Sequence, residues 1–164
     1  MNGEDLLDAF AVKAYEPPLS LHRESGRIAD VSDPVSVIML VVDLDTEVSM
    51  NGITDFIGNS TGLYAAETAQ ALEQIGCQKD AGVLRQILDA AHGAGMTHEA
   101  IQAERSGVPP YTVTSFSKLH GTKRKEAVSR IERLHRLMDF EGIRRKAADY
   151  VAEHETLVRR VLGR

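Results

Sequence analysis

Apolar side chains recur every three or four residues along most of the chain, the spacing at which side chains share one face of an α-helix. Turn-forming residues separate the periodic stretches: Pro17-Pro18 stops the first, and Gly76 suits the left-handed residue that ends a helix. The pattern predicts helices over residues 4–14, 65–75, 81–91, 97–106, 122–138 and 143–161.

The most apolar segment, residues 35–48, fits two structures. Its β-branched run from Val37 to Val42 is typical of a buried strand, and periodicity alone does not decide. We favour a helix, because the apolar pattern continues to Val48 and because a capping aspartate, Asp33, precedes a proline that suits a first helical turn. A short apolar segment over 53–57 follows and ends in the turn-forming residues 58–62.

Residues 107–122 show no helical period, and we interpret them as a long loop. The sequence therefore predicts an all-α fold: a single compact domain of about seven to eight helices over residues 1–164, with basic helices over about 122–163. A chain of 164 residues is long enough to bury a core without a metal or disulfide.

Composition indicates a reducing compartment. Cys77 is the single cysteine, so no intrachain disulfide can form. The first residues are acidic where a secretory signal would be basic, and no apolar run approaches the roughly 18 residues that span a bilayer. We expect a cytoplasmic protein without a membrane segment.

The net charge of −5 is unevenly distributed. Up to Glu104 the chain has 17 acidic residues and 5 Lys or Arg, a net of −12, whereas residues 105–164 have 7 acidic residues and 14 Lys or Arg, a net of +7. Such asymmetry indicates either an interaction surface or acidic and basic helices that neutralise each other inside the fold. Both explanations stay open at this stage.

No pattern of residues points to catalysis, a cofactor or a metal. The six histidines form no pair at metal-ligand spacing, so we expect structural or solvent-facing roles for them. The acidic residues Asp43, Asp45 and Glu47 could serve a cation or acid–base chemistry, but Asp43 and Glu47 share one side of a helix while Asp45 points away. We therefore predict an exposed acidic face, to which Asp55 is added.

Residues 44–62 resemble the signature of the DNA mimic protein 19-like family, which reads Glu-Val-Asn-Asn-Gly-Gly-Phe, two further positions, an aromatic pair and Asn-Ser-Ser-Gly. The resemblance extends over about 34–88, through a helix that ends in Ala-Leu-Glu-Gln-Ile-Gly. The candidate binding residues that it marks are Glu47, Asn51, Gly52, Phe56, Asn59, Ser60 and Gly62.

The resemblance implies an all-helical cytoplasmic domain whose best-known relative is a dimeric acidic protein that imitates DNA and engages a DNA-binding regulator. We accordingly expect a non-enzymatic protein-binding module, regulatory or of the immunity type, whose acidic face binds a basic protein partner. The resemblance also leaves open that the protein forms a homodimer. One alternative is nucleic-acid binding through the basic C-terminal helices. Another is an enzyme with a pocket where Glu47, Asn51 and Asn59 converge.

Overall fold

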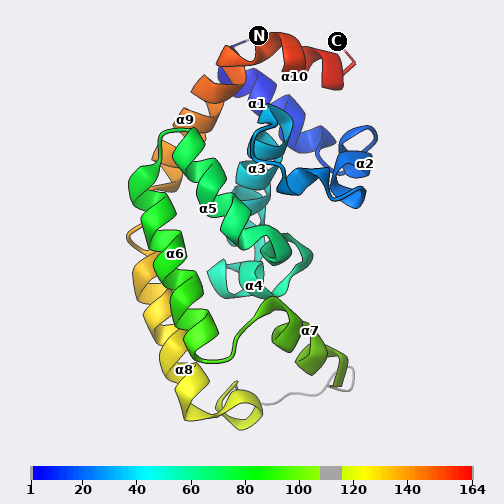
Figure 1. Ribbon diagram of the computed structural model, residues 1–164. Coiled ribbons are helices and arrows are strands. Elements are labelled where there is room, and N and C mark those ends of the chain that lie inside the picture. Colours follow the sequence, from blue (N-terminus) through cyan, green and yellow to red (C-terminus); the bar gives the residue numbers. More distant parts are fainter. Residues whose placement is uncertain (1, 108–115, 164) are drawn as a thin grey trace.

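The computed structural model describes residues 2–107 and 116–163, with side chains for 2–106 and 124–163. Every regular element in these ranges is helical, which confirms the all-α prediction (Figure 1). The α-helices are α1 (Gly3–Lys13), α2 (Leu19–Glu24), α3 (Pro34–Asn51), α4 (Ile53–Gly58), α5 (Ala65–Gln74), α6 (Gln78–Gly93), α7 (His98–Gly107), α8 (Phe116–His135), α9 (Phe140–Glu153) and α10 (Glu155–Val161). Two 3₁₀-helices, η1 (Arg27–Ala29) and η2 (Ser60–Tyr64), complete the described elements.

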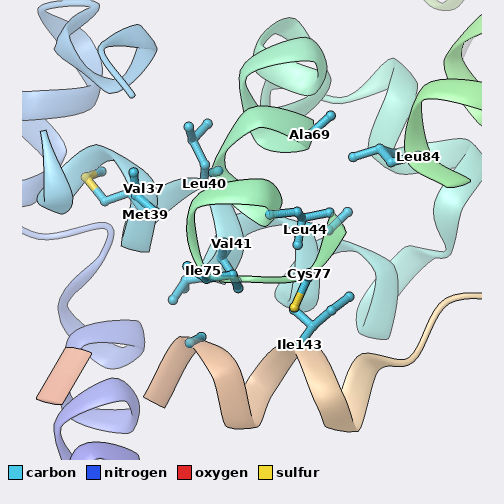
Figure 2. Packing of buried hydrophobic residues seen from close by; sticks show 14 of the residues in the cluster. Val37, Met39, Leu40, Val41, Leu44, Ala69, Ile75, Cys77, Leu84 and Ile143 are labelled. Atoms are coloured by element: carbon cyan, nitrogen blue, oxygen red, sulfur yellow. The ribbon is translucent and has the colours of Figure 1, made fainter. Parts of the chain in front are cut away.

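The segment that fitted either a helix or a strand is the central helix, α3. The Asp33 side chain accepts a hydrogen bond from the Val35 amide at 2.9 Å, and Pro34 occupies the first turn, as predicted. All ten residues from Val35 to Leu44 are buried. Since α5, α4, η1 and α9 surround the helix, its β-branched side chains find apolar contacts on more than one side (Figure 2).

The other long helices pack in pairs around α3. α1 lies against α9, α5 against α6, and α6 beside α8 (Figure 1). Gly3 allows the close contact between α1 and α9, because a Cβ there would come closer than 3.0 Å to the Ala148 carbonyl oxygen. The buried Asp80 accepts a hydrogen bond from the Asp139 amide at 2.8 Å, which fixes the start of α6 to the junction of α8 and α9.

Two predicted boundaries are wrong. The predicted loop over 107–122 ends early, because α8 begins at Phe116; residues 108–115 lie outside the described part of the chain. The first turns of α8 have no apolar stripe, so the spacing of apolar residues did not reveal that they are helical. The predicted final helix is two helices, which meet at His154. The apolar pattern crosses this break because Val151 and Val158 are both buried.

The sequence pattern also missed α2, which is attached to α3 through a buried histidine. His22 Nε2 lies 2.8 Å from Ser36 Oγ, and the Ser36 hydroxyl donates to the Arg27 carbonyl at 2.9 Å. That hydroxyl has one proton, so the ring nitrogen must donate to it. Burial lowers the pKa of His22, against the attraction of Asp33, whose Oδ2 is 3.8 Å from Nε2.

We therefore predict acid destabilisation through His22. The unfolded histidine binds a proton below about pH 6.5, while folded His22 binds it only at lower pH. The contribution of His22 to the free energy of unfolding is thus complete above about pH 6.5. It is lost as pH falls through the folded pKa, by up to about 1.4 kcal/mol per pH unit. Urea unfolding at several pH values should show a shallower loss for His22→Gln, and equal slopes in both proteins would contradict the assignment.

Candidate functional site

Three polar residues of the predicted site meet at the C-terminal end of α3. Glu47 Oε1 accepts a hydrogen bond from Asn51 Nδ2 at 2.8 Å, one helical turn further on. The same oxygen accepts a second bond from Asn59 Nδ2, in the turn between α4 and η2. The convergence of Glu47, Asn51 and Asn59 is therefore real, and its immediate result is to fasten this turn to α3.

Helix α7 extends this network with a residue that sequence reasoning missed. Arg105 donates from Nη1 to Asn59 Oδ1 at 2.5 Å and from Nη2 to Asp55 Oδ1 at 3.1 Å. Gly58 permits the approach of α7, since a Cβ there would lie 2.7 Å from Ile101 Cγ2. Arg105 stands 46 residues after Asn59, and no local spacing links the two positions.

The remaining motif residues shape the turns. Phe56 is fully buried in the core, and Gly62 is buried where a Cβ would come closer than 3.0 Å to the carbonyl oxygens of Phe56 and Ile57. Gly52 has a φ of +87°, which joins α3 to α4 through a conformation that favours glycine. Of the seven predicted site residues, only Asn51 and Ser60 are exposed.

The predicted acidic face is wrong at Asp43, which is only 3% exposed. Because α3 is surrounded on all sides, this carboxylate faces the interior, where it forms two hydrogen bonds with the Arg23 guanidinium and accepts one from the Tyr15 hydroxyl at 3.1 Å. The other three carboxylates also have partners. Asp45 lies 3.9 Å from Arg144, Glu47 holds its two asparagines, and Asp55 pairs with Arg105.

The environment of Asp43 alters several pKa values. Burial raises the pKa of Asp43, while the hydrogen bonds and charge of Arg23 act in the opposite direction. Burial, followed by the charge of Asp43 and the hydrogen bond to it, raises the pKa of Tyr15 to about 12. The Arg23 Cζ also lies 4.8 Å from the centre of the Tyr15 ring, a cation–π distance. This arrangement keeps a charged pair stable inside the fold.

Basic residues of the C-terminal third pair with acidic residues of the N-terminal part, as one of the two explanations of the charge asymmetry requires. These pairs are Arg105 with Asp55, Arg124 with Glu104, and Arg144 with Asp8 and Asp45. Internal neutralisation therefore accounts for part of the asymmetry.

Two cavities that the described residues form lie away from the α3–α7 network. One, of about 300 Å³, is lined by Pro17, Pro18, Arg160 and neighbouring residues, and the other, of about 30 Å³, lies between α1, α3 and α9. Among the described residues, no three His, Cys, Asp or Glu side chains are grouped so as to hold a metal ion. In the same residues, no helix combines the length and apolarity needed to cross a membrane.

The fold and the motif network define a compact all-α protein in which one polar cluster joins α3, the α4–η2 turn and α7. The chain belongs to the DMP19-like protein family, whose model matches residues 29–154. This match extends well beyond residues 34–88 and includes the basic helix α8 and helix α9. Comparison with curated proteins gives no match, and comparison with solved structures gives none either.

Gly62 provides a direct test of the motif's role in folding. Gly62→Ala should lower the free energy of unfolding by about 3 kcal/mol, because its Cβ would overlap two carbonyl oxygens of the backbone. The matched control is Gly82→Ala inside α6, where a Cβ meets nothing within 4 Å and should add about 1 kcal/mol through helix propensity. Chemical denaturation measures both, and an unchanged stability of Gly62→Ala would refute the prediction.

Asp43→Ala should cost about 3 kcal/mol, near the lower end for breaking a buried ion pair, because Arg23 keeps some access to water. The comparison variant is Asp45→Ala, two residues along the same helix, where the half-exposed carboxylate lies 3.9 Å from Arg144 and its loss should cost less than about 1 kcal/mol. Equal losses in thermal or urea unfolding would show that Asp43 does not stabilise Arg23.

Proposed function

We propose that the protein is a non-enzymatic binding module, in the manner of a DNA mimic, which presents carboxylates to a basic protein partner such as a DNA-binding regulator. Membership of the DMP19-like family supports this function. The acidic surface that we assign to it differs from the one predicted from the sequence, because Asp43 is buried and Glu47 and Asp55 are engaged with neighbouring residues. Of the carboxylates assigned here, Asp8 also pairs with Arg144.

The observation that best supports the proposal is a group of exposed carboxylates at one end of the molecule. We call this the acidic end, and it comprises Glu4, Asp5, Asp8, Asp149 and Glu153. The first three lie on α1 and the last two on α9, and the close contact of Gly3 with Ala148 brings the two helices together (Figure 1). The group therefore combines exposed carboxylates from two helices that are distant in sequence and pack together.

The spacing of these carboxylates suits a partner that binds a regular row of negative charges. Glu4 and Asp8 are four residues apart on α1, as are Asp149 and Glu153 on α9. Side chains at this helical spacing have Cβ atoms about 5 to 6 Å apart. A basic protein that contacts successive phosphates would meet a comparable series of anions here.

The role of the motif residues favours binding over catalysis. Glu47 and Asn59 satisfy each other's hydrogen bonds, and Arg105 uses its guanidinium on Asn59 and Asp55. Groups committed to one another in this way hold α7 and the α4–η2 turn on α3.

The test is capture of partners from a lysate of the source cell, followed by affinity measurement with the purified partner. We expect a basic protein whose affinity falls with salt. The triple variant Glu4→Gln, Asp149→Asn and Glu153→Gln should weaken binding about tenfold, as the loss of three exposed charge pairs of about 0.5 kcal/mol each implies.

The matched control removes three exposed or half-exposed carboxylates elsewhere, in the variant Glu67→Gln, Asp89→Asn and Glu99→Gln. It should retain nearly the full affinity of the unmodified protein. Capture of chaperones alone, or equal losses in the two triple variants, would be evidence against the proposal.

A further inference from the structure

Helix α8 has an inner apolar side and an outer basic side. Ile131 is buried, with Val128 and Leu134 half-buried on the same side, and α8 lies along α6. The opposite side carries exposed cations on the last turns of α8 and just beyond its end. We call this the basic face, and it comprises Lys125, Arg130, Arg133 and Arg136.

The cations of the basic face differ from several other arginines of the C-terminal third, although not from Arg145 and Arg160, which also form no ion pair within the described residues. Arg105, Arg124 and Arg144 are engaged in ion pairs with acidic residues. Within the described residues, no ion pair is formed by the four cations of the basic face. Two acidic residues lie within this stretch, the exposed Glu126 and Glu132, whose side chain is 45% exposed, so residues 125–136 keep a net charge of +2.

We propose that the basic face of α8 binds the phosphate backbone of duplex DNA without reading its sequence. The charge complementarity is direct, since Arg and Lys that neutralise phosphates release the counterions of DNA. Arginine guanidinium groups also match phosphate oxygens in pairs of hydrogen bonds. The inference is independent of the acidic end, which lies toward the chain termini, whereas α8 lies below α9 in the view of Figure 1.

A protein partner fits this face less well. Protein interfaces gain most of their affinity from aromatic or apolar side chains buried at the centre of the contact. Between residues 124 and 136 the exposed side chains are all polar or charged, and the exposed Leu137 follows only at the end. Contacts with phosphates need cations alone.

The shape of the face favours duplex DNA over other nucleic acids. Single strands are bound largely by stacking of bases on aromatic rings, and the exposed side of α8 from residue 124 to 136 has none. An α-helix about 10 to 12 Å across fits the major groove of B-DNA, whereas that of duplex RNA is too narrow. From Lys125 to Arg136 the helix rises about 16 Å, enough to meet several successive phosphates.

The experiment measures fluorescence anisotropy of a labelled 20-base-pair DNA duplex with the full chain between 50 and 200 mM salt. We expect weak binding that is similar for unrelated sequences. The slope of log K against log salt should be no steeper than about −3.6, the value for four phosphate contacts. Arg130→Glu with Arg133→Glu should weaken binding at least tenfold and should make the slope shallower by about 2.

The control Lys13→Glu with Lys79→Glu makes the same change in net charge at exposed positions on α1 and α6. It should weaken binding less than threefold. If circular dichroism shows that the glutamate variant does not fold, Arg130→Gln with Arg133→Gln replaces it, with the same direction of change expected.

Four results would overturn the proposal. The first is no binding at 50 mM salt, and the second is an equal loss in the control variant, which would indicate overall charge. The third is a folded variant that binds as well as the unmodified protein. The fourth is tighter binding of a 20-nucleotide single strand or of an RNA duplex, since either would mean a different mode of recognition.

Discussion

The burial of residues 35–44 of α3 sets a condition that the surrounding structure has to meet. A polar group in this part of the helix is removed from water and must find a partner within the protein. Ser36 and Asp43, seven residues apart on one side of α3, obtain theirs from His22 and Arg23, which are neighbours on α2. A helix of six residues is not stable alone in water, so α2 owes its position to these two contacts and to buried Leu19.

The same side of α3 continues toward the motif. Glu47 follows Asp43 by four residues and Asn51 follows Glu47 by four, so polar side chains form a stripe along nearly the whole helix. Ser36 and Asp43 hold α2, whereas Glu47 holds the turn before η2 and, through Asn59, also α7. The apolar remainder of α3 packs on α5 and α9. The stripe thus determines which elements cover each side of the central helix.

Sequence patterns revealed the local features of this arrangement and missed the distant ones. Asp33 and Pro34 indicated the start of α3, and the turns at Gly52 and Gly62 lie where the motif suggested. The burial of Asp43 could not be predicted, because it depends on Arg23 of α2 and on Tyr15, which lies between α1 and α2. Arg105 was missed for the same reason, since its partners are distant in sequence and its charge resembles that of many surface residues.

The separation of exposed charge has a consequence for the motion of the protein in solution. Carboxylates at the meeting point of α1 and α9 and cations along α8 contribute opposite charges to the electric dipole moment of the molecule. In the field of a charged macromolecule, such a dipole biases rotational diffusion, and the molecule arrives with the complementary surface in front. Productive encounters then become more frequent than random tumbling allows. Added salt weakens this advantage, because it screens the field beyond a Debye length of about 10 Å at 0.1 M.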